Sequence, residues 1–313
     1  MKKIITKIKE NGGFVNAHSH IDRANTASYF SKEEQYAFLK EKWRLVDKIK
    51  NQSSTSDYKN RMLECIEDQK AFGVTALLSF IDIDDIAGFR AFDAACEVRE
   101  ESDLNFKIAC QTLKGVLSLK YQMMIEFQLP QIDIIGSLPS ADNDKSKHLD
   151  VVMKWAKDYN KRLHVHVDQL NTADEKETEL LARKTMQWGI EDKVTAVHSI
   201  SLACHSKYYR NEVYKMSRDA GLSFICCPSA WIDHPRREDL APIHNSITPV
   251  DELIKNDLIV AIGSDNIMDV YKPYCDGDMA FELRMLLEAC KIYNEDELVK
   301  IATTNGRKVL GID

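Results

Sequence analysis

Eight short apolar runs recur at steady intervals along the chain, and they limit its fold more than any other feature of the sequence. Each holds about six residues rich in Val, Ile and Phe, without the polar alternation of a half-exposed strand. Runs of this kind are expected of parallel strands that are buried on both faces. They cover residues 14–18, 74–80, 106–111, 132–137, 162–167, 194–199, 222–227 and 258–264.

The stretches between these runs space their apolar residues by three and four, which predicts helices. Residues 31–49 open with Ser31 and carry Glu34 three positions later, which predicts a capping box. Residues 57–73 end at Gly73, a natural helix stop. Further helices are predicted within residues 140–161, 172–189 and 294–311.

Strand and helix alternate eight times, which is the count of a TIM (β/α)8 barrel. A doubly wound open sheet is the alternative, but eight strands are many for it and no GxGxxG motif follows the first strand. The 313 residues contain no internal linker or low-complexity tract. We therefore expect a single barrel domain over residues 1–313.

Composition and charge argue against several classes of partner. The net charge of −7 disfavours nucleic acid and anionic membranes, and no run approaches the roughly 18 apolar residues of a membrane span. The lysine-rich start of the chain lacks the apolar stretch of a signal peptide. The eight cysteines form no CxxC pair and lie mostly in apolar runs, which predicts reduced thiols in a cytoplasmic protein. We expect a small-molecule substrate as partner, with a homo-oligomer left open.

Metal-capable side chains stand where four of the predicted strands end. The carboxyl ends of barrel strands meet on one face, where catalytic residues gather, and residues at i and i+2 of a strand point to the same side. The remaining histidines fall in predicted helices or loops. The strand-end residues are His18 and His20 on the first strand, His164, His166 and Asp168 on the fifth, His198 on the sixth and Asp265 on the eighth.

Each of these side chains also has an ordinary structural explanation. A His-x-His pair can pack or face solvent, His198 can be a core histidine, and Asp265 can cap the following helix. Their coincidence at four strand ends favours a metal site instead, because three imidazoles and one carboxylate bind a first-row metal and leave room for water.

The motifs HSHIDR, HVHVDQ, VHS and GSDN together resemble those of the amidohydrolase superfamily, specifically its cytosine deaminase-like branch. That branch has HxHxD on strand one, HxDE on strand five, SH on strand six and an Asp at the end of strand eight. The segment IATTNGRKVLGI is similar to the family's last helix, so the resemblance extends over nearly the whole chain. Many relatives add a small β-sandwich before strand one and after the last helix. With the first predicted strand near Phe14, we expect little or no such sandwich here.

The resemblance implies a site for one divalent metal, with zinc expected first and iron as the alternative. It implies that Asp265 also carries protons, and that His198 contacts the water or the reacting group of the substrate. Binuclear relatives add a carboxylated lysine after strand four, but that strand ends here in IIGSLPSAD, so one metal is favoured. The implied ligands are His18, His20, His166 and Asp265.

Two positions depart from the cytosine deaminase pattern. Gln169 replaces the strand-five Glu, and an amide can hydrogen-bond a substrate but cannot carry a proton at neutral pH. Either Asp265 performs all proton transfer, or the substrate differs from cytosine. After strand three, where the family has a substrate-facing Gln, the sequence reads Leu113 and Lys114. Lys114 and Arg23 are predicted to attract a carboxylate or another anion, with salt bridges at the barrel rim as the alternative.

The longest loop region, within residues 226–253, follows the seventh predicted strand and should lie over the site. Its candidates for substrate contact are Trp231, His234, Arg236 and Arg237, which are equally explained as surface residues of a long loop. After the eighth strand, the family pattern implies that Asp269 braces the loop that carries Asp265.

The chain is therefore predicted to be a metal-dependent hydrolase that cleaves a C–N bond, other than a peptide bond, in a small, polar, nitrogen-rich or heterocyclic substrate. The alternatives are a cyclic or linear amide hydrolase, and a catalytically silent barrel that keeps its metal. A phosphate-binding barrel would need a Gly-rich cradle after strands seven and eight, which CCPSAW and GSDNIM do not offer.

Overall fold

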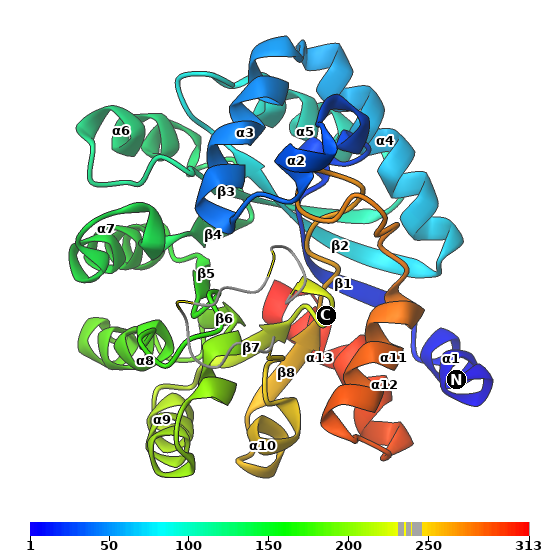
Figure 1. The fold of residues 1–313 in the computed structure, drawn as a ribbon, viewed down its shortest axis with the longest axis vertical. Coiled ribbons are helices and arrows are strands. Elements are labelled where there is room, and N and C mark those ends of the chain that lie inside the picture. Colours follow the sequence, from blue (N-terminus) through cyan, green and yellow to red (C-terminus); the bar gives the residue numbers. More distant parts are fainter. Residues whose placement is uncertain (231–234, 236–238, 240–245, 313) are drawn as a thin grey trace.

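A computed structural model of the chain describes residues 1–230, 235, 239 and 246–312 and holds one sheet of eight parallel strands (Figure 1). The strands follow chain order around the sheet, and each pairs in parallel with the next. This arrangement confirms the predicted TIM barrel, and each predicted run coincides with one strand. The strands are β1 (Phe14–Ser19), β2 (Val74–Asp82), β3 (Asn105–Gln111), β4 (Ile134–Ser137), β5 (Arg162–Val167), β6 (Val194–His198), β7 (Ser223–Cys226) and β8 (Ile259–Ile262).

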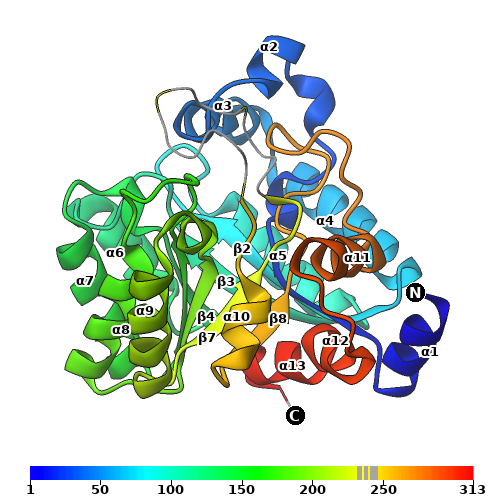
Figure 2. The same ribbon diagram turned by 60° about the horizontal axis from the view of Figure 1, so that its bottom comes forward.

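Helices surround the sheet on all sides (Figure 1). Seen from the side, α2 and α3 stand above one end of the barrel and α13 lies below the other (Figure 2). The helices are α1 (Lys2–Glu10), α2 (Lys32–Gln35), α3 (Leu39–Gln52), α4 (Thr55–Ala71), α5 (Arg90–Glu101), α6 (Leu119–Gln128), α7 (Lys145–Asp158), α8 (Glu177–Trp188), α9 (Lys207–Asp219), α10 (Val250–Lys255), α11 (Met279–Cys290), α12 (Glu295–Ala302) and α13 (Thr304–Leu310).

Residues 31–49 form two helices instead of the one predicted. Ser31 and Glu34 make the expected capping box, but α2 ends after one turn. A new helix, α3, starts where the side chain of Glu41 accepts a hydrogen bond from the backbone N–H of Phe38 (3.0 Å). The restart carries α3 over the carboxyl ends of the strands (Figure 2).

Helix α1 was not predicted from the sequence. It buries Ile4 and Ile8 in the core, while Lys3 and Lys7 lie 2.8 and 3.1 Å from a carboxylate oxygen of Glu295 on α12. A helix this short depends on tertiary packing rather than on intrinsic propensity. The spacing of Ile4, Ile5 and Ile8 was a local signal for this helix that the sequence analysis did not use.

Strand β8 returns to β1 through backbone hydrogen bonds at the strand ends. The N–H of Asp265 donates to the carbonyl oxygen of His18 (3.0 Å), and the N–H of His20 donates to that of Asp265 (3.2 Å). Gly263 permits this approach, because a Cβ there would lie 2.7 Å from the His18 carbonyl oxygen. The barrel therefore closes at the residues that the sequence predicts to bind metal.

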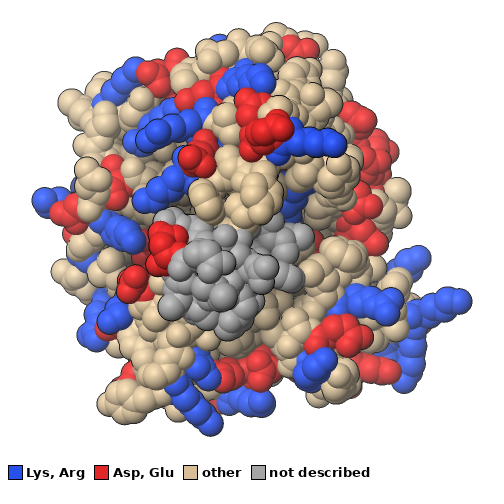
Figure 3. Space-filling model, in the orientation of Figure 1, with Lys and Arg blue, Asp and Glu red and all other residues tan. Residues whose placement is uncertain are grey.

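None of the helices within the described residues combines the length and the apolar character needed to cross a membrane. All eight cysteines are free thiols. On the face that carries the ends of the strands, Lys and Arg side chains lie among Asp and Glu side chains rather than in one basic patch (Figure 3).

The contact between Gly263 and β1 predicts that Gly263→Ala destabilises the barrel. The new methyl group would meet backbone atoms of His18, which cannot rotate away, so we expect the free energy of unfolding to fall by about 1–3 kcal/mol. Urea unfolding followed by circular dichroism measures this change.

Gly189→Asn is the matched control, because nothing lies within 4 Å of a Cβ at that position and Asn tolerates its φ of +63°. We expect this change to alter the free energy of unfolding by less than about 1 kcal/mol. Equal stability of the two variants would contradict the role given to Gly263.

Candidate active site

The carboxyl ends of β1, β5, β6 and β8 bring four histidines and Asp265 together. The rings of His18 and His166 lie 4.8 Å apart between centroids, and that of His198 lies 5.3 Å from each of them. The Nε2 atoms of His18 and His20 both lie 3.3 Å from Oδ1 of Asp265. The structure thus gathers all five residues that the sequence analysis assigned to metal binding and catalysis.

Two overlapping groups in this cluster have the geometry to hold a metal ion. In each, the candidate ligand atoms lie within 4.8 Å of one another. Nε2 of His18 is buried without a hydrogen-bond partner despite facing a carboxylate oxygen, an arrangement that a cation between them would satisfy. The groups are His18 with His20 and Asp265, and His18 with His166 and His198.

The protonation of the cluster suits a divalent cation. Burial lowers the pKa of His20 and His198 to about 3, and it lowers the pKa of His166 as well, so these imidazoles are neutral near pH 7. Burial alone would raise the pKa of Asp265, but His18 and His20 beside it hold that pKa well below its usual value. Neutral imidazoles and an ionised carboxylate are the forms in which these residues bind metal.

Neighbouring groups orient the cluster. His166 donates from Nδ1 to the carbonyl oxygen of Ser137 (3.1 Å), which leaves the Nε2 lone pair directed into the site. The ring of Phe80 packs edge-on at 4.7 Å from both His18 and His166. Asn266 donates from Nδ2 to Oδ2 of Asp265 (2.9 Å), so one oxygen of that carboxylate is fixed.

The loop before Asp265 is held by residues that the sequence analysis did not single out. Asn16 donates from Nδ2 to Oγ of Ser264 (2.8 Å) and accepts from the N–H of Ser264 (3.0 Å). Lys272 donates from Nζ to the carbonyl oxygen of Ser264. These contacts help to hold Asp265 at a φ of +61°, which is uncommon for a residue other than glycine.

Two polar residues at the end of β5 point away from the cluster. His164 sits two residues before His166, one layer lower in the barrel, and donates from Nε2 to the carbonyl oxygen of Val309 (3.0 Å) on α13. Asp168 turns back at a φ of +53° and accepts from the N–H of Glu177 (2.7 Å) at the start of α8. Neither belongs to the metal-capable groups.

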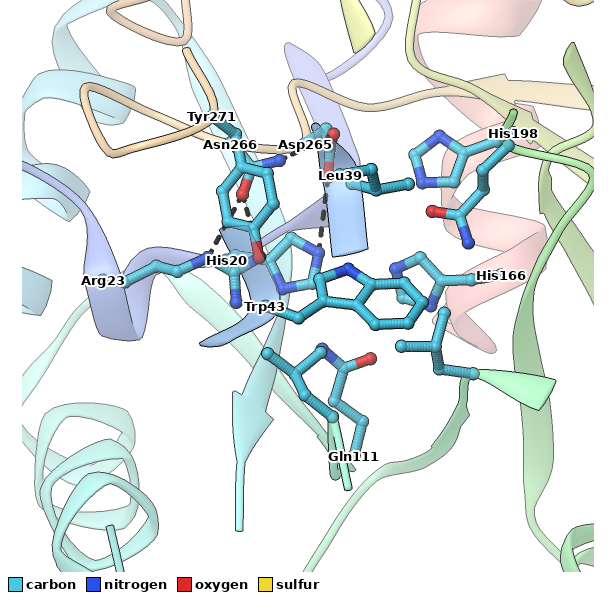
Figure 4. A pocket seen from close by; sticks show the side chains of 13 residues that line it. His20, Arg23, Leu39, Trp43, Gln111, His166, His198, Asp265, Asn266 and Tyr271 are labelled. Atoms are coloured by element: carbon cyan, nitrogen blue, oxygen red, sulfur yellow. Dashed lines mark hydrogen bonds and ion pairs between the residues drawn. The ribbon is translucent and has the colours of Figure 1, made fainter. Parts of the chain in front are cut away.

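A pocket opens over the cluster, and Figure 4 shows the side chains that line it. Of the predicted substrate contacts, Arg23 and Gln169 line this pocket. Lys114 does not, and its Nζ instead lies 2.5 Å from Oδ2 of Asp47 on α3. The pocket is lined by His20, Arg23, Leu39, Trp43, Gln111, Leu113, Leu138, His166, Gln169, His198, Asp265, Asn266 and Tyr271.

Trp231, His234, Arg236 and Arg237 lie outside the described residues. The prediction that they contact substrate therefore stays a prediction.

Gln111 and Trp43 line the pocket but were missed by the sequence analysis. Gln111 ends β3, so a glutamine does line the pocket from that strand, two positions before Leu113, which the sequence analysis took as the replacement for the family's Gln. The sequence did offer a signal for this, because Gln111 is the last residue of the predicted strand 106–111 and the carboxyl ends of the strands face the site. Trp43 comes from α3, whose position over the barrel depends on the helix restart.

Arg23 follows β1 and is buried among polar partners. Its Nε lies 3.2 Å from Oδ2 of Asp269, its Nη2 donates to Oδ1 of Asn266 (2.8 Å), and its guanidinium lies 4.9 Å from the ring centroid of Tyr271. Asp269 also accepts from the backbone N–H of Tyr271 (2.8 Å). Asp269 thus links the loop after β8 to the loop after β1, next to Asp265.

Comparisons with known proteins agree with the resemblance that the motifs suggested. The profile of the amidohydrolase family matches residues 30–313. An uncharacterized protein of Haemophilus influenzae is 43% identical over 260 residues, which cover 79% of this chain and 92% of that protein. N-isopropylammelide isopropyl amidohydrolase of a Pseudomonas species is 24% identical over 314 residues, with coverage of 96% and 74%.

The fold also matches solved structures. 5-Methylcytosine deaminase from Klebsiella pneumoniae superposes with a TM-score of 0.86 at 23% identity, over 96% of this chain and 74% of that one. N-isopropylammelide isopropylaminohydrolase from Burkholderia multivorans gives a TM-score of 0.78 at 20% identity, with coverage of 96% and 75%. At these identities the likeness shows a shared fold.

Three buried carboxyl groups hold the loop that presents Gln169. Glu175 accepts from the backbone N–H of Leu170 (2.7 Å) and from Oγ of Ser201 (2.7 Å). Burial and the nearby charges of Glu177 and Asp168 raise the pKa of Glu175 to about 8. The folded protein therefore binds a proton here that the unfolded chain releases at a much lower pH.

Because of this proton, we expect the free energy of unfolding to fall as pH rises from about 4.5, the pKa of an unfolded Glu, to about 8. Glu175→Gln should remove much of the slope, with a difference on the order of 2 kcal/mol across that window. Urea unfolding at several pH values measures it. The neighbouring exposed Asp174→Asn is the control and should leave the slope unchanged. Parallel pH profiles for Glu175→Gln and the parent protein would contradict the assignment.

Proposed function

Since this chain belongs to the amidohydrolase family, we propose that it is a metal-dependent hydrolase that cleaves a C–N bond of a small, polar, nitrogen-rich heterocycle. The observation that carries the proposal is the convergence of three histidines of lowered pKa, His18, His20 and His166, with ionised Asp265. All of these except His18 line the pocket. Similar proteins named for N-isopropylammelide and 5-methylcytosine support the substrate class.

The residues would hold one divalent ion. Three imidazole nitrogens and one carboxylate suit zinc first, with iron as the alternative. When bound, such an ion makes a proton of water easier to remove near neutral pH. Zinc as the ion and the cytoplasm as the location remain predictions. The proposed ligands are His18, His20, His166 and Asp265.

Asp265 and His198 would carry the proton chemistry. The Asp265 carboxylate is ionised, so it can accept a proton from water and pass it to the leaving nitrogen. His198 is neutral and buried, and its Nδ1 has no hydrogen-bond partner. Its ring can therefore hydrogen-bond an atom attached to the reacting carbon as charge develops on that atom. Gln169 lines the pocket and supplies hydrogen bonds but no proton.

The shape of the pocket favours a flat substrate over a linear amide. The indole of Trp43 lines the pocket together with Leu39 and His166 (Figure 4). Flat rings stack well on such surfaces. Amide hydrolysis remains a second candidate because Gln169 stands where a proton-carrying Glu is found in the deaminases, and cleavage of an amide needs only one carboxylate.

Metal binding gives the first test of this proposal. We expect the purified protein to contain about one equivalent of divalent metal, and His20→Ala to weaken its binding by roughly 100-fold or more. Elemental analysis and chelator competition measure both. The exposed Asp219→Asn should keep the metal. Full metal content in His20→Ala would refute the ligand assignment.

Turnover gives the second test, through ammonia or amine release from a panel of aminated pyrimidines, triazines and pterins, with linear amides alongside. Loss of the proton carrier in Asp265→Asn should lower kcat by roughly 1,000-fold, and His198→Asn by roughly 100-fold. Asp219→Asn serves again as the control. A metal-loaded protein that turns over nothing in the panel would favour the catalytically silent barrel.

A further inference from the structure

Ser137, His148 and Asp142 form a hydrogen-bonded chain beside the metal-capable cluster. Nε2 of His148 on α7 lies 2.9 Å from Oγ of Ser137 at the end of β4, and Nδ1 of the same ring lies 2.7 Å from Oδ2 of Asp142. The order of the three groups is that of a Ser–His–Asp hydrolase triad. Ser137 is only 2% exposed, however, and it is not among the described residues that line the pocket. A serine that no substrate reaches is no nucleophile, so the chain does not act as a second catalytic site.

The chain ends at His166 instead. The carbonyl oxygen of Ser137 accepts a hydrogen bond from Nδ1 of His166 (3.1 Å). In the part of the molecule that the structure describes, the Nδ1 atoms of the other three clustered histidines are buried without a hydrogen-bond partner; these are His18, His20 and His198. Within that part, His166 is therefore the one clustered histidine whose ring is oriented by a bond at Nδ1, and Ser137 accepts that bond.

Asp142 anchors the other end of the chain. Its Oδ2 also accepts from the backbone N–H groups of Val116 (2.8 Å) and Leu117 (3.3 Å), in the loop after β3. A carboxylate only accepts hydrogen bonds, so Nδ1 of His148 carries a proton and donates it to Asp142.

This direction of donation fixes the hydroxyl group of Ser137. In the neutral ring of His148, a proton on Nδ1 leaves Nε2 as an acceptor, so the hydroxyl group donates to Nε2. The side chain of Ser137 is thus held against α7, which lies beside β4 (Figure 1). Because the side chain and the carbonyl group belong to one residue, holding the first limits rotation of the second.

We propose that His148 is a positioning residue for the metal ligand His166. It holds the hydroxyl group of Ser137, so that the carbonyl oxygen of Ser137 stays on Nδ1 of His166 and Nε2 of that ring faces the metal. The inference rests on the proposed function, because it takes His166 as a ligand. Loss of a partner behind a metal ligand typically weakens metal binding by roughly 10- to 100-fold.

Two variants each keep one half of the chain. The amide of His148→Gln reaches as far as Nε2 of the imidazole and can keep the contact with Ser137, whereas the shorter amide of His148→Asn reaches only the place of Nδ1 and can keep the contact with Asp142. We expect His148→Asn to bind zinc roughly tenfold more weakly than the parent protein, and His148→Gln to stay within about threefold of it. Chelator competition on the zinc-loaded proteins measures these affinities. Equal affinities of the two variants, or the reverse order, would overturn the proposal, because a role limited to Asp142 favours the asparagine.

Cobalt in place of zinc reports the direction of the ligands separately from affinity, through its visible absorption spectrum. We expect His148→Asn and Ser137→Ala to change this spectrum in the same way. The double variant should resemble each single one, since both substitutions break one chain. A parental spectrum in folded, cobalt-loaded His148→Asn would overturn the positioning role, and circular dichroism confirms folding.

Trp155→Phe is the matched control for the loss of a buried hydrogen bond on α7. Trp155 is 2% exposed and donates from Nε1 to Oε1 of Glu126 on α6 (2.8 Å). We expect this variant to keep the parental affinity and spectrum. An effect as large as that of His148→Asn would assign the support to α7 as a whole and contradict a specific role for His148.

The outcomes also separate this inference from the proposed function. A parent protein that binds no divalent metal would overturn both. A parent protein that binds zinc no more tightly than His148→Asn would overturn this inference alone.

Discussion

The backbone of Asp265 is hydrogen-bonded to His18 and His20 at the end of β1, and these two bonds both close the barrel and bring the metal-capable side chains together. Asp265 adopts a left-handed conformation, which is uncommon for residues other than glycine although Asp tolerates it better than most, and the surrounding structure helps to hold it there. Asn16 and Lys272 contribute by fixing the preceding residue. The geometry of the site is therefore a property of barrel closure and not of the five clustered side chains alone.

The pocket wall combines buried charges of both signs. Arg23 and Lys50 lie among Asp82, Asp84 and Asp269, and each cation has more than one carboxylate within 4 Å. Buried charges persist only when they are paired, and removal of one partner leaves the other uncompensated. A wall that is neutralised internally presents a pattern of donors and acceptors to the ligand rather than net charge.

The sequence predicted those features that leave a local signal. Strands buried on both faces appear as apolar runs, and His18, His20, His166, His198 and Asp265 stand at the ends of those runs. The sequence did not predict contacts that depend on how distant segments meet. The partners of Arg23 come from β2 and from the loop after β8, so its neutralised state could not be foreseen. Trp43 reaches the pocket only because the chain starts a new helix after Phe38, where a continuous helix was expected.

Among the described residues that line the pocket, Asp265 is the only carboxylate. Gln169 takes the place where the cytosine deaminases carry a second acid, so a proton for the leaving nitrogen has two sources here: Asp265, or the substrate itself. In the proposed reaction a single carboxylate would be sufficient, because it would accept the proton before the C–N bond breaks and donate it as the bond breaks.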